Sequence, residues 1–224
     1  MSIQGEGMLA GVPSVFIRTS GCNLRCTWCD TRYASWEPEG GEMDVAQIMA
    51  ELKKLGPRHV VVTGGEPMIA RGIGDLLAAL ERDGRHITVE TAATALPGGA
   101  PCHLASLSPK LSNSAPKAEE TDTAWIERHE RRRRQPEVIR EWIRAYPFQL
   151  KFVVTSESDL DEIGALLADV REEILPERVL LMPEGTDSTT LQQRALWLVD
   201  VCKSTGFRFC PRLHIELFGL TRGT

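Results

Sequence analysis

The sequence lacks any long apolar run and any excess of positive charge. No stretch approaches the roughly 20 consecutive apolar residues that a helix needs to cross a bilayer. The first residues, Met1 to Gly7, do not show the basic-then-apolar order of a secretory signal. With 26 basic and 31 acidic residues the formal net charge is −5, which is unlike the basic footprint of nucleic-acid-binding proteins. We therefore expect a cytoplasmic protein that binds neither membrane nor nucleic acid.

The remaining composition is that of an ordinary globular protein. Its 224 residues are 42% hydrophobic and 25% charged, which is enough for one domain with a core of its own. We expect a single domain over residues 1–224, with the polar segment 112–135 as an excursion from the core. The basic run Arg131 to Arg134 follows several glutamates, and this spacing predicts a solvated helix face with ion pairs one turn apart.

Strand-like and helix-like segments alternate along the chain. Short β-branched or apolar runs predict strands over 14–20, 59–63, 87–91, 104–107, 150–155 and 179–182, and a last strand running through Leu213. Amphipathic spacing predicts helices over 44–55, 72–83, 137–145, 160–170 and 189–204, the first capped by Asp44. Repeated strand–helix units imply an α/β fold with a parallel sheet, whose ligands bind beyond the carboxyl ends of the strands. About six strands are too few for a closed eight-stranded barrel, so we expect a partial, TIM-like barrel.

Three of the six cysteines fall within eight positions directly after a predicted strand. Cys22, Cys26 and Cys29 have the spacing C-x3-C-x2-C, and thiolates suit iron–sulfur clusters or zinc. A structural zinc ion takes four ligands, and no fourth Cys or His lies nearby in the sequence. We therefore interpret the motif as a [4Fe–4S] site with one iron open to a further ligand. The scattered thiols, Cys102, Cys202 and Cys210, are predicted to be structural.

This motif, with the aromatic Trp28 before its third cysteine, resembles the signature of the radical S-adenosylmethionine (SAM) superfamily. The resemblance implies that SAM binds the open iron and is cleaved to a radical that abstracts a hydrogen atom from the substrate. Thr63-Gly64-Gly65-Glu66-Pro67 follows an apolar strand and looks like the glycine-rich segment that binds SAM, with a backbone free to bond a ligand. The resemblance places SAM against Trp28, Cys29, Asp30, Gly65, Glu66, Ser108, Pro109, Lys110, Met182, Pro183, Glu184 and Gly185.

Further motifs narrow the resemblance. The segments Ile3-Gln4-Gly5-Glu6-Gly7, Cys29-Asp30-Thr31, Glu90-Thr91, Ser108-Pro109-Lys110, Gln149 to Val154 and Leu213-His214 together resemble the 7-carboxy-7-deazaguanine synthase family over nearly the whole chain. This resemblance implies a lyase of queuosine and 7-deazapurine biosynthesis. It would convert 6-carboxy-5,6,7,8-tetrahydropterin to 7-carboxy-7-deazaguanine with loss of ammonia, and it would need Mg²⁺. A homodimer and an electron donor such as flavodoxin or ferredoxin are also implied.

Residue chemistry suits these implied roles. Glu6 can accept from the donor edge of a pterin, and Gln4 offers both a donor and an acceptor. Arg18 can make a paired contact with a carboxylate, and Thr31 offers a hard oxygen to Mg²⁺. No protein residue is assigned as catalytic, because the SAM-derived radical performs the chemistry. The implied substrate site comprises Ile3, Gln4, Gly5, Glu6, Arg18, Thr63, Glu90, Thr91, His214 and Thr224.

Simpler interpretations of the same residues stay open at this point. Arg18 could instead neutralise the charge of the cluster, and Glu6 could lie in a surface loop. Thr31 could cap a helix, and His214 could be a buried, hydrogen-bonded core histidine. Each alternative differs from the site interpretation in where the side chain lies.

The chain departs from the family pattern in two places. Ala92 and Ala93 stand where the family often has Asn-Gly, and the short strand that usually precedes the Gln4 to Gly7 motif is barely present. Two other functions also remain open. An activase that makes a glycyl radical on a protein would need no pterin pocket around Gln4 to Gly7. A non-catalytic iron–sulfur or zinc module would need neither Trp28 nor the Gly64-Gly65 pair.

Overall fold

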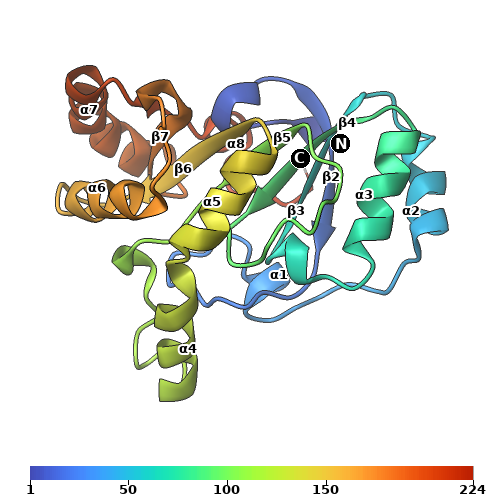
Figure 1. Ribbon diagram of the computed structural model, residues 1–224, viewed down its shortest axis with the longest axis horizontal. Helices are drawn as coiled ribbons and strands as arrows, with labels where there is room; N and C mark the ends of the chain where they lie inside the picture. Colours follow the sequence, from blue (N-terminus) through green and yellow to red (C-terminus); the bar gives the residue numbers. More distant parts are fainter. Residues whose placement is uncertain (224) are drawn as a thin grey trace.

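A computed structural model describes residues 1–223 as one eight-stranded sheet with helices along its outer face (Figure 1). The strands follow one another in chain order, β1 pairs with β2 antiparallel, and every other pair is parallel. Among the described residues β8 does not pair with β1, so the expected partial barrel is confirmed. The strands are β1 (Ser2–Ile3), β2 (Pro13–Thr19), β3 (His59–Gly64), β4 (His86–Thr91), β5 (Leu104–Leu107), β6 (Phe148–Val154), β7 (Val179–Pro183) and β8 (Arg208–Phe209).

Five helices begin and end within three residues of the predicted segments, whereas the short helices Arg32–Ser35 and Leu213–Phe218 were not predicted. The capping box at Asp44 is present, with its side chain accepting from Gln47 N and its own N–H donating to the Gln47 side chain. No helix in the described part of the chain is both long and apolar enough to cross a membrane. The α-helices are α1 (Arg32–Ser35), α2 (Val45–Leu52), α3 (Ile73–Arg82), α4 (Thr123–Arg133), α5 (Pro136–Ala145), α6 (Asp159–Val170), α7 (Ser188–Thr205) and α8 (Leu213–Phe218). Short 3-10 turns are η1 (Gly7–Leu9), η2 (Pro67–Ile69), η3 (Ser112–Ser114) and η4 (Pro176–Arg178).

Alternation along the strands divides the sheet into an apolar face and a polar face. On β4, Ile87 and Val89 join the hydrophobic core, whereas Glu90 lines a cavity on the opposite face. On β6, Phe152 faces the core and Lys151 faces the cavity. The helices therefore cover the apolar face, and the fold places polar side chains on the concave face, where a ligand can bind.

The last predicted strand is wrong beyond Phe209. β8 ends there, and Leu213 begins α8 instead of continuing the sheet. Pro211 has no N–H to donate to a strand ladder, which favours an end to pairing at this point. The chain then turns inward, and the Leu213 N–H donates to Gly5 O. At the other end, the short strand in doubt from the sequence is present as β1, which pairs with the beginning of β2.

The segment 112–135 contains η3 and α4. Figure 1 shows α4 projecting away from the sheet, below α5 in that view. Most side chains of α4 are exposed. His129, by contrast, is fully buried.

Candidate functional site

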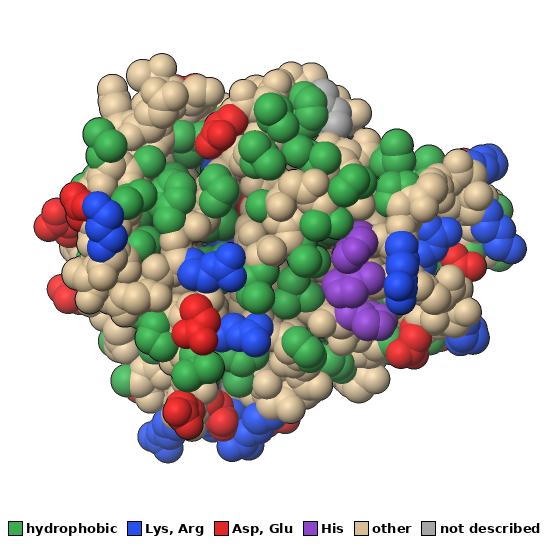
Figure 2. All heavy atoms as spheres, turned by 90° about the horizontal axis from the view of Figure 1, so that it is seen from above, with side chains coloured by type: hydrophobic (Ala, Val, Ile, Leu, Met, Phe, Trp, Pro, Cys, Tyr) green, Lys and Arg blue, Asp and Glu red, His purple; other side chains and the backbone are tan. Residues whose placement is uncertain are grey.

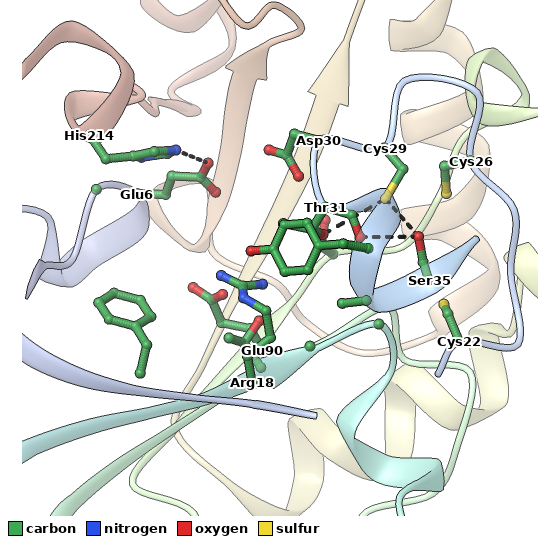
Figure 3. Close-up of a pocket in the computed structure, with 18 of the residues that line it drawn as sticks. Glu6, Arg18, Cys22, Cys26, Cys29, Asp30, Thr31, Ser35, Glu90 and His214 are labelled. Carbon is green, nitrogen blue, oxygen red and sulfur yellow. Dashed lines mark hydrogen bonds and ion pairs between the residues drawn. The ribbon is translucent and has the colours of Figure 1, made fainter. Parts of the chain in front are cut away.

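A cavity of about 670 Å³ opens at the carboxyl ends of the strands, where the sequence predicted a site. Figure 3 shows the three motif cysteines on one side of it and Glu6 and His214 on the other. The volume is typical of small-molecule pockets. The predicted site residues that line it are Ile3, Gln4, Gly5, Glu6, Arg18, Cys22, Cys26, Trp28, Cys29, Asp30, Thr31, Thr63, Gly65, Glu90, Thr91, Ser108, Lys110, Met182, Glu184 and His214.

The three thiols lie on the loop between β2 and α1, and all are free of disulfides. Burial raises the pKa of the Cys22 thiol to about 11 and that of Cys26 to about 12. Within the described residues, no three Cys, His, Asp or Glu side chains are arranged to hold a metal ion. In a [4Fe–4S] cube each thiolate binds a different iron, so the three thiols of a cluster site need not converge on one point.

The glycine pair after β3 makes a close backbone contact that differs from the expected one. A Cβ on Gly65 would lie 2.2 Å from Gly21 O, and one on Gly64 would lie 2.3 Å from Thr19 O. The Gly65 N–H donates to Thr19 O, so it is not free for a ligand as the sequence suggested. The pair is needed because the end of β3 packs directly against the backbone that begins the cysteine loop.

Glu6 lies inside the site, paired with two cations. Its carboxylate accepts from Lys151 Nζ through one oxygen and from Arg212 Nε at 3.1 Å through the other. Burial alone would raise the pKa of Glu6, but the charges of Lys151 and Arg212 outweigh it and hold the pKa far below its usual range. Glu6 is therefore a permanent anion that faces the cavity, and the surface-loop alternative is wrong.

Sequence reasoning missed both of these cations. Lys151 interrupts an otherwise apolar strand two positions after Gln149. Residues two apart on a strand lie on the same face, so this pair indicates a polar face that lines the cavity. Arg212 carried no comparable signal, although it is buried and also donates to Asp30 and to Gly185 O. It thereby links Glu6 to the Cys29-Asp30-Thr31 segment.

Arg18 differs from these two cations because its side chain has no partner within residues 1–223. It lines the cavity from β2, is exposed, and its guanidinium makes no hydrogen bond or ion pair with the described residues. Figure 3 shows it beside Glu90, whose carboxylate accepts from Gln4 Nε2 at 3.0 Å. An unpaired guanidinium at a cavity wall is suited to a carboxylate ligand.

His214 lies on the first turn of α8, with Nε2 3.9 Å from Glu6 Oε1. Burial lowers the pKa of His214, so the ring is neutral near pH 7. Its ring occupies the space above Gly5, where a Cβ would lie 2.0 Å from Nδ1. His214 lines the cavity, and Gly5 allows its ring to reach this position.

Thr31 occupies the N-cap position of α1, but its side chain makes no capping hydrogen bond. Its hydroxyl lies 3.8 Å from Cys29 Sγ and lines the cavity. This position leaves the oxygen available to a hard cation next to the thiols.

Four residues predicted to contact SAM do not line the cavity. Glu66 is fully buried and accepts from Thr91 Oγ1 at 2.7 Å and from Ala92 N at 2.9 Å, so it joins the ends of β3 and β4. Gly185 meets Arg212 through its carbonyl. Pro109 and Pro183 are buried beside residues that do line the site. Thr224 lies outside the described residues.

The Ala92-Ala93 departure has a visible backbone consequence. Ala93 has φ of 54°, in the left-handed region where the glycine of the related motif would be unstrained. Ala92 lines the cavity with a methyl group where an asparagine amide would bring a polar group.

Comparisons with known proteins agree with this geometry. A model of the radical SAM superfamily matches residues 16–107. The chain is 45% identical over 225 residues to the 7-carboxy-7-deazaguanine synthase of Rhodopirellula baltica, covering 100% of this chain and 86% of the relative. It is 46% identical to the enzyme of the same name from Halobacterium salinarum, covering 97% and 87%. The crystal structure of QueE from Escherichia coli shares the fold, with a TM-score of 0.65 at 24% identity over 95% of this chain and 91% of that one.

Proposed function

The chain belongs to the 7-carboxy-7-deazaguanine synthase family, and on that premise we propose that it converts 6-carboxy-5,6,7,8-tetrahydropterin to 7-carboxy-7-deazaguanine with loss of ammonia. Membership makes it a radical SAM lyase of 7-deazapurine biosynthesis that uses a [4Fe–4S] cluster and SAM. The substrate assignment rests on which charged side chains of the cavity already have a partner within residues 1–223. Within this range the Arg18 side chain has no hydrogen-bond or ion-pair partner, while Glu6 is an anion held by two buried cations.

We assign the cluster to Cys22, Cys26 and Cys29, three free thiols that line the cavity. When bound there, the cluster and SAM supply the radical that abstracts a hydrogen atom from the substrate. The glycine pair and Trp28 form the wall beside this site. Lys110 adds a positive charge, with Nζ 5.4 Å from the centre of the Trp28 ring, which suits an anionic cluster and the SAM carboxylate.

The opposite wall holds and orients the substrate. Arg18 would take the pterin carboxylate in a paired contact, which fixes one end of the molecule. Glu6, held as an anion, would accept from the amidine-like edge, and Gln4 with Glu90 would complete the donors and acceptors around the ring. The neutral His214 can donate or accept a hydrogen bond. Two fixed contacts at opposite ends of a flat ligand would set which carbon faces the radical.

Three further assignments complete the proposal. Thr31 binds Mg²⁺, with the substrate and water providing the other ligands, because one neutral hydroxyl is too weak a site alone. A flavodoxin or ferredoxin supplies the electron. The protein acts as a homodimer. These assignments rest on the family resemblance and on the position of Thr31 at the cavity wall.

Anaerobic turnover tests the reaction. Reconstituted protein receives SAM, a reductant, Mg²⁺ and 6-carboxytetrahydropterin, and the products are identified by mass spectrometry. We expect 7-carboxy-7-deazaguanine. Cleavage of SAM to 5′-deoxyadenosine without this product would retain the radical chemistry and reject the pterin. Stoichiometric zinc without iron in anaerobically purified protein would reject both.

Arg18→Lys and Arg18→Ala test the substrate orientation. A lysine keeps the charge but not the planar fork, so we expect Lys to restore only part of the affinity lost with Ala. If Arg18 only neutralised the cluster, both variants would retain the wild-type KM for the pterin.

A further inference from the structure

His129 is a fully buried residue on the arginine-rich helix α4, most of whose other side chains are exposed. Burying an imidazole costs free energy unless its ring nitrogens are hydrogen-bonded. Both nitrogens of His129 have partners, and both partners lie outside α4. One of them belongs to the loop that carries the three site thiols.

The hydrogen bonds define a single tautomer. The backbone N–H of Arg25 donates to His129 Nδ1 at 3.1 Å, so the ring proton is on Nε2. Nε2 lies 3.0 Å from Ser114 Oγ and donates to it. The Ser114 hydroxyl in turn donates to Leu111 O at 2.6 Å. Burial lowers the pKa of His129 to about 4, so this neutral form persists through the physiological range.

The same side of the molecule holds the loop at three further points. Thr27 N–H donates to Ser114 O at 3.0 Å, and Trp28 Nε1–H donates to Asn113 O at 3.0 Å. The guanidinium of Arg25 lies 3.9 Å from the centre of the Trp125 ring. That guanidinium also donates to the carbonyls of Cys22 and Leu24.

We propose that His129 is a positioning residue for the cysteine loop, and that α4 and η3 act through it as a clamp on the iron–sulfur site. The three thiols are carried by a loop without regular secondary structure, and residues 25, 27 and 28 between them are bonded to 113, 114 and 129. The segment that departs from the sheet is thus part of the cluster site's support. The proposal rests on the assignment of Cys22, Cys26 and Cys29 as cluster ligands.

Hydrogen exchange of the cluster-free protein tests the clamp independently of function. His129→Ala removes both bonds, and we expect amide exchange in peptides covering 22–29 to quicken on the order of tenfold, while peptides from β4 and β6 stay unchanged. Arg132→Ala, on the exposed side of the same helix, is the matched control and should exchange like wild type. Unchanged exchange over 22–29 in His129→Ala would overturn the proposal.

Two milder substitutions keep the test decisive if the alanine variant does not fold. His129→Asn places an amide oxygen near the position of Nδ1 and keeps the bond from Arg25, whereas His129→Gln reaches toward Ser114 and loses it. We expect His129→Asn to resemble wild type and His129→Gln to show the faster exchange. The reverse order, or equal exchange in both, would contradict the role given to the Arg25 bond.

The cluster-loaded protein gives a second readout. Under anaerobic conditions we expect iron release to a chelator to be several-fold faster in His129→Gln than in His129→Asn or Arg132→Ala. The electron paramagnetic resonance signal of the reduced, SAM-bound cluster should also broaden. Equal release rates and identical spectra would refute the clamp. If wild type and variants all fail to retain iron while exchange still responds to His129, the assigned function fails and the loop contact stands.

Discussion

The two ends of the sheet differ in whether their buried polar groups have hydrogen-bond or ion-pair partners. At the carboxyl end, Glu6 is paired with two cations, and Glu66 accepts from three donors. At the amino end, His59, His86 and His103 stack with ring centroids 4.5 and 5.1 Å apart. There the Nδ1 atoms of His59 and His86 are buried without a hydrogen-bond partner among the described residues.

Both arrangements arise from strand register. His59 and His86 are register partners at the beginnings of β3 and β4, and Figure 2 shows histidine side chains gathered into one patch beside basic ones. The neighbouring charge is Arg58, with no carboxylate among the groups that shift the pKa of His86. Burial is therefore not what separates the two ends. The carboxyl end supplies Glu6 with two cations and Glu66 with three hydrogen-bond donors, whereas the amino end brings like groups together.

Removing a thiol at the carboxyl end should have the largest effect. Cys26→Ala leaves the cluster with two ligands, and we expect iron content below a tenth of wild type and activity below a thousandth, measured by iron analysis and turnover. Cys102→Ala, a thiol toward the amino end, is the control and should retain both. Normal iron content in Cys26→Ala would break the assigned contrast.

Neutralising Glu6 should have the next largest effect. Glu6→Gln leaves Lys151 and Arg212 buried without their shared anion, and breaking such a buried pair costs about 3 kcal/mol of unfolding free energy. Urea unfolding of the cluster-free protein measures it. Glu51→Gln removes an exposed pair with Lys54 and should change stability by less than about 0.5 kcal/mol. Equal effects at the two positions would mean that the Glu6 pairs are not buried in solution.

The histidine cluster at the amino end should make the protein less stable as the pH falls. Burial and the neighbouring His59, His103 and Arg58 lower the pKa of His86 below 6.5, so the unfolded chain binds this proton at higher pH than the native one. The stability contributed by neutral His86 is present above about pH 6.5 and is lost as pH falls toward its native pKa. We expect His86→Gln to lose less stability than wild type between pH 7.5 and 5, in thermal melts. An identical pH dependence in the two proteins would contradict this.

The smallest effect is expected at Ala93. Glycine would relieve a left-handed alanine, worth about 1 kcal/mol, but would remove a buried methyl group worth about 0.8 kcal/mol. The unfolded state also gains freedom with glycine. These contributions nearly cancel, so Ala93→Gly should change the free energy of unfolding by less than about 0.5 kcal/mol. A larger loss would show that packing outweighs strain here.

The sequence predicted what depends on local pattern. Short apolar runs located β2 to β7 within one or two residues, and Asp44 marked the beginning of α2. The cysteine spacing and the short motifs that contain Glu6, Arg18 and His214 predicted a common site, and all of these residues line one cavity. Each of these signals lies within a few consecutive residues.

What the sequence could not predict depends on distant pairs. Arg212 meets Glu6 across 206 residues, and no local pattern encodes such a contact. The packing reason for the Gly64-Gly65 pair could not be predicted either. The backbone atoms of Thr19 and Gly21, which leave no room for a Cβ on these glycines, lie at or just after the end of β2, more than 40 residues earlier in the chain. The prediction of a solvated helix face at Arg131 to Arg134 did not distinguish His129, because its partners, Arg25 and Ser114, become neighbours only after folding.

The pairing of Glu6 with Arg212 has a consequence for how the chain matures during synthesis. The thiol loop and its contacts from 111–129 are encoded in the first part of the chain and can assemble while the ribosome is still translating. The wall of the cavity around Glu6 cannot assemble at that stage. Its contacts with Arg212, Leu213 and Cys210 form only after the last segment of the chain has been synthesised. Such long-range closures form late in folding. On the proposed assignment, a nascent chain would acquire the cysteine loop before it acquires a complete pocket, so that insertion of iron and recognition of substrate would be separated in time.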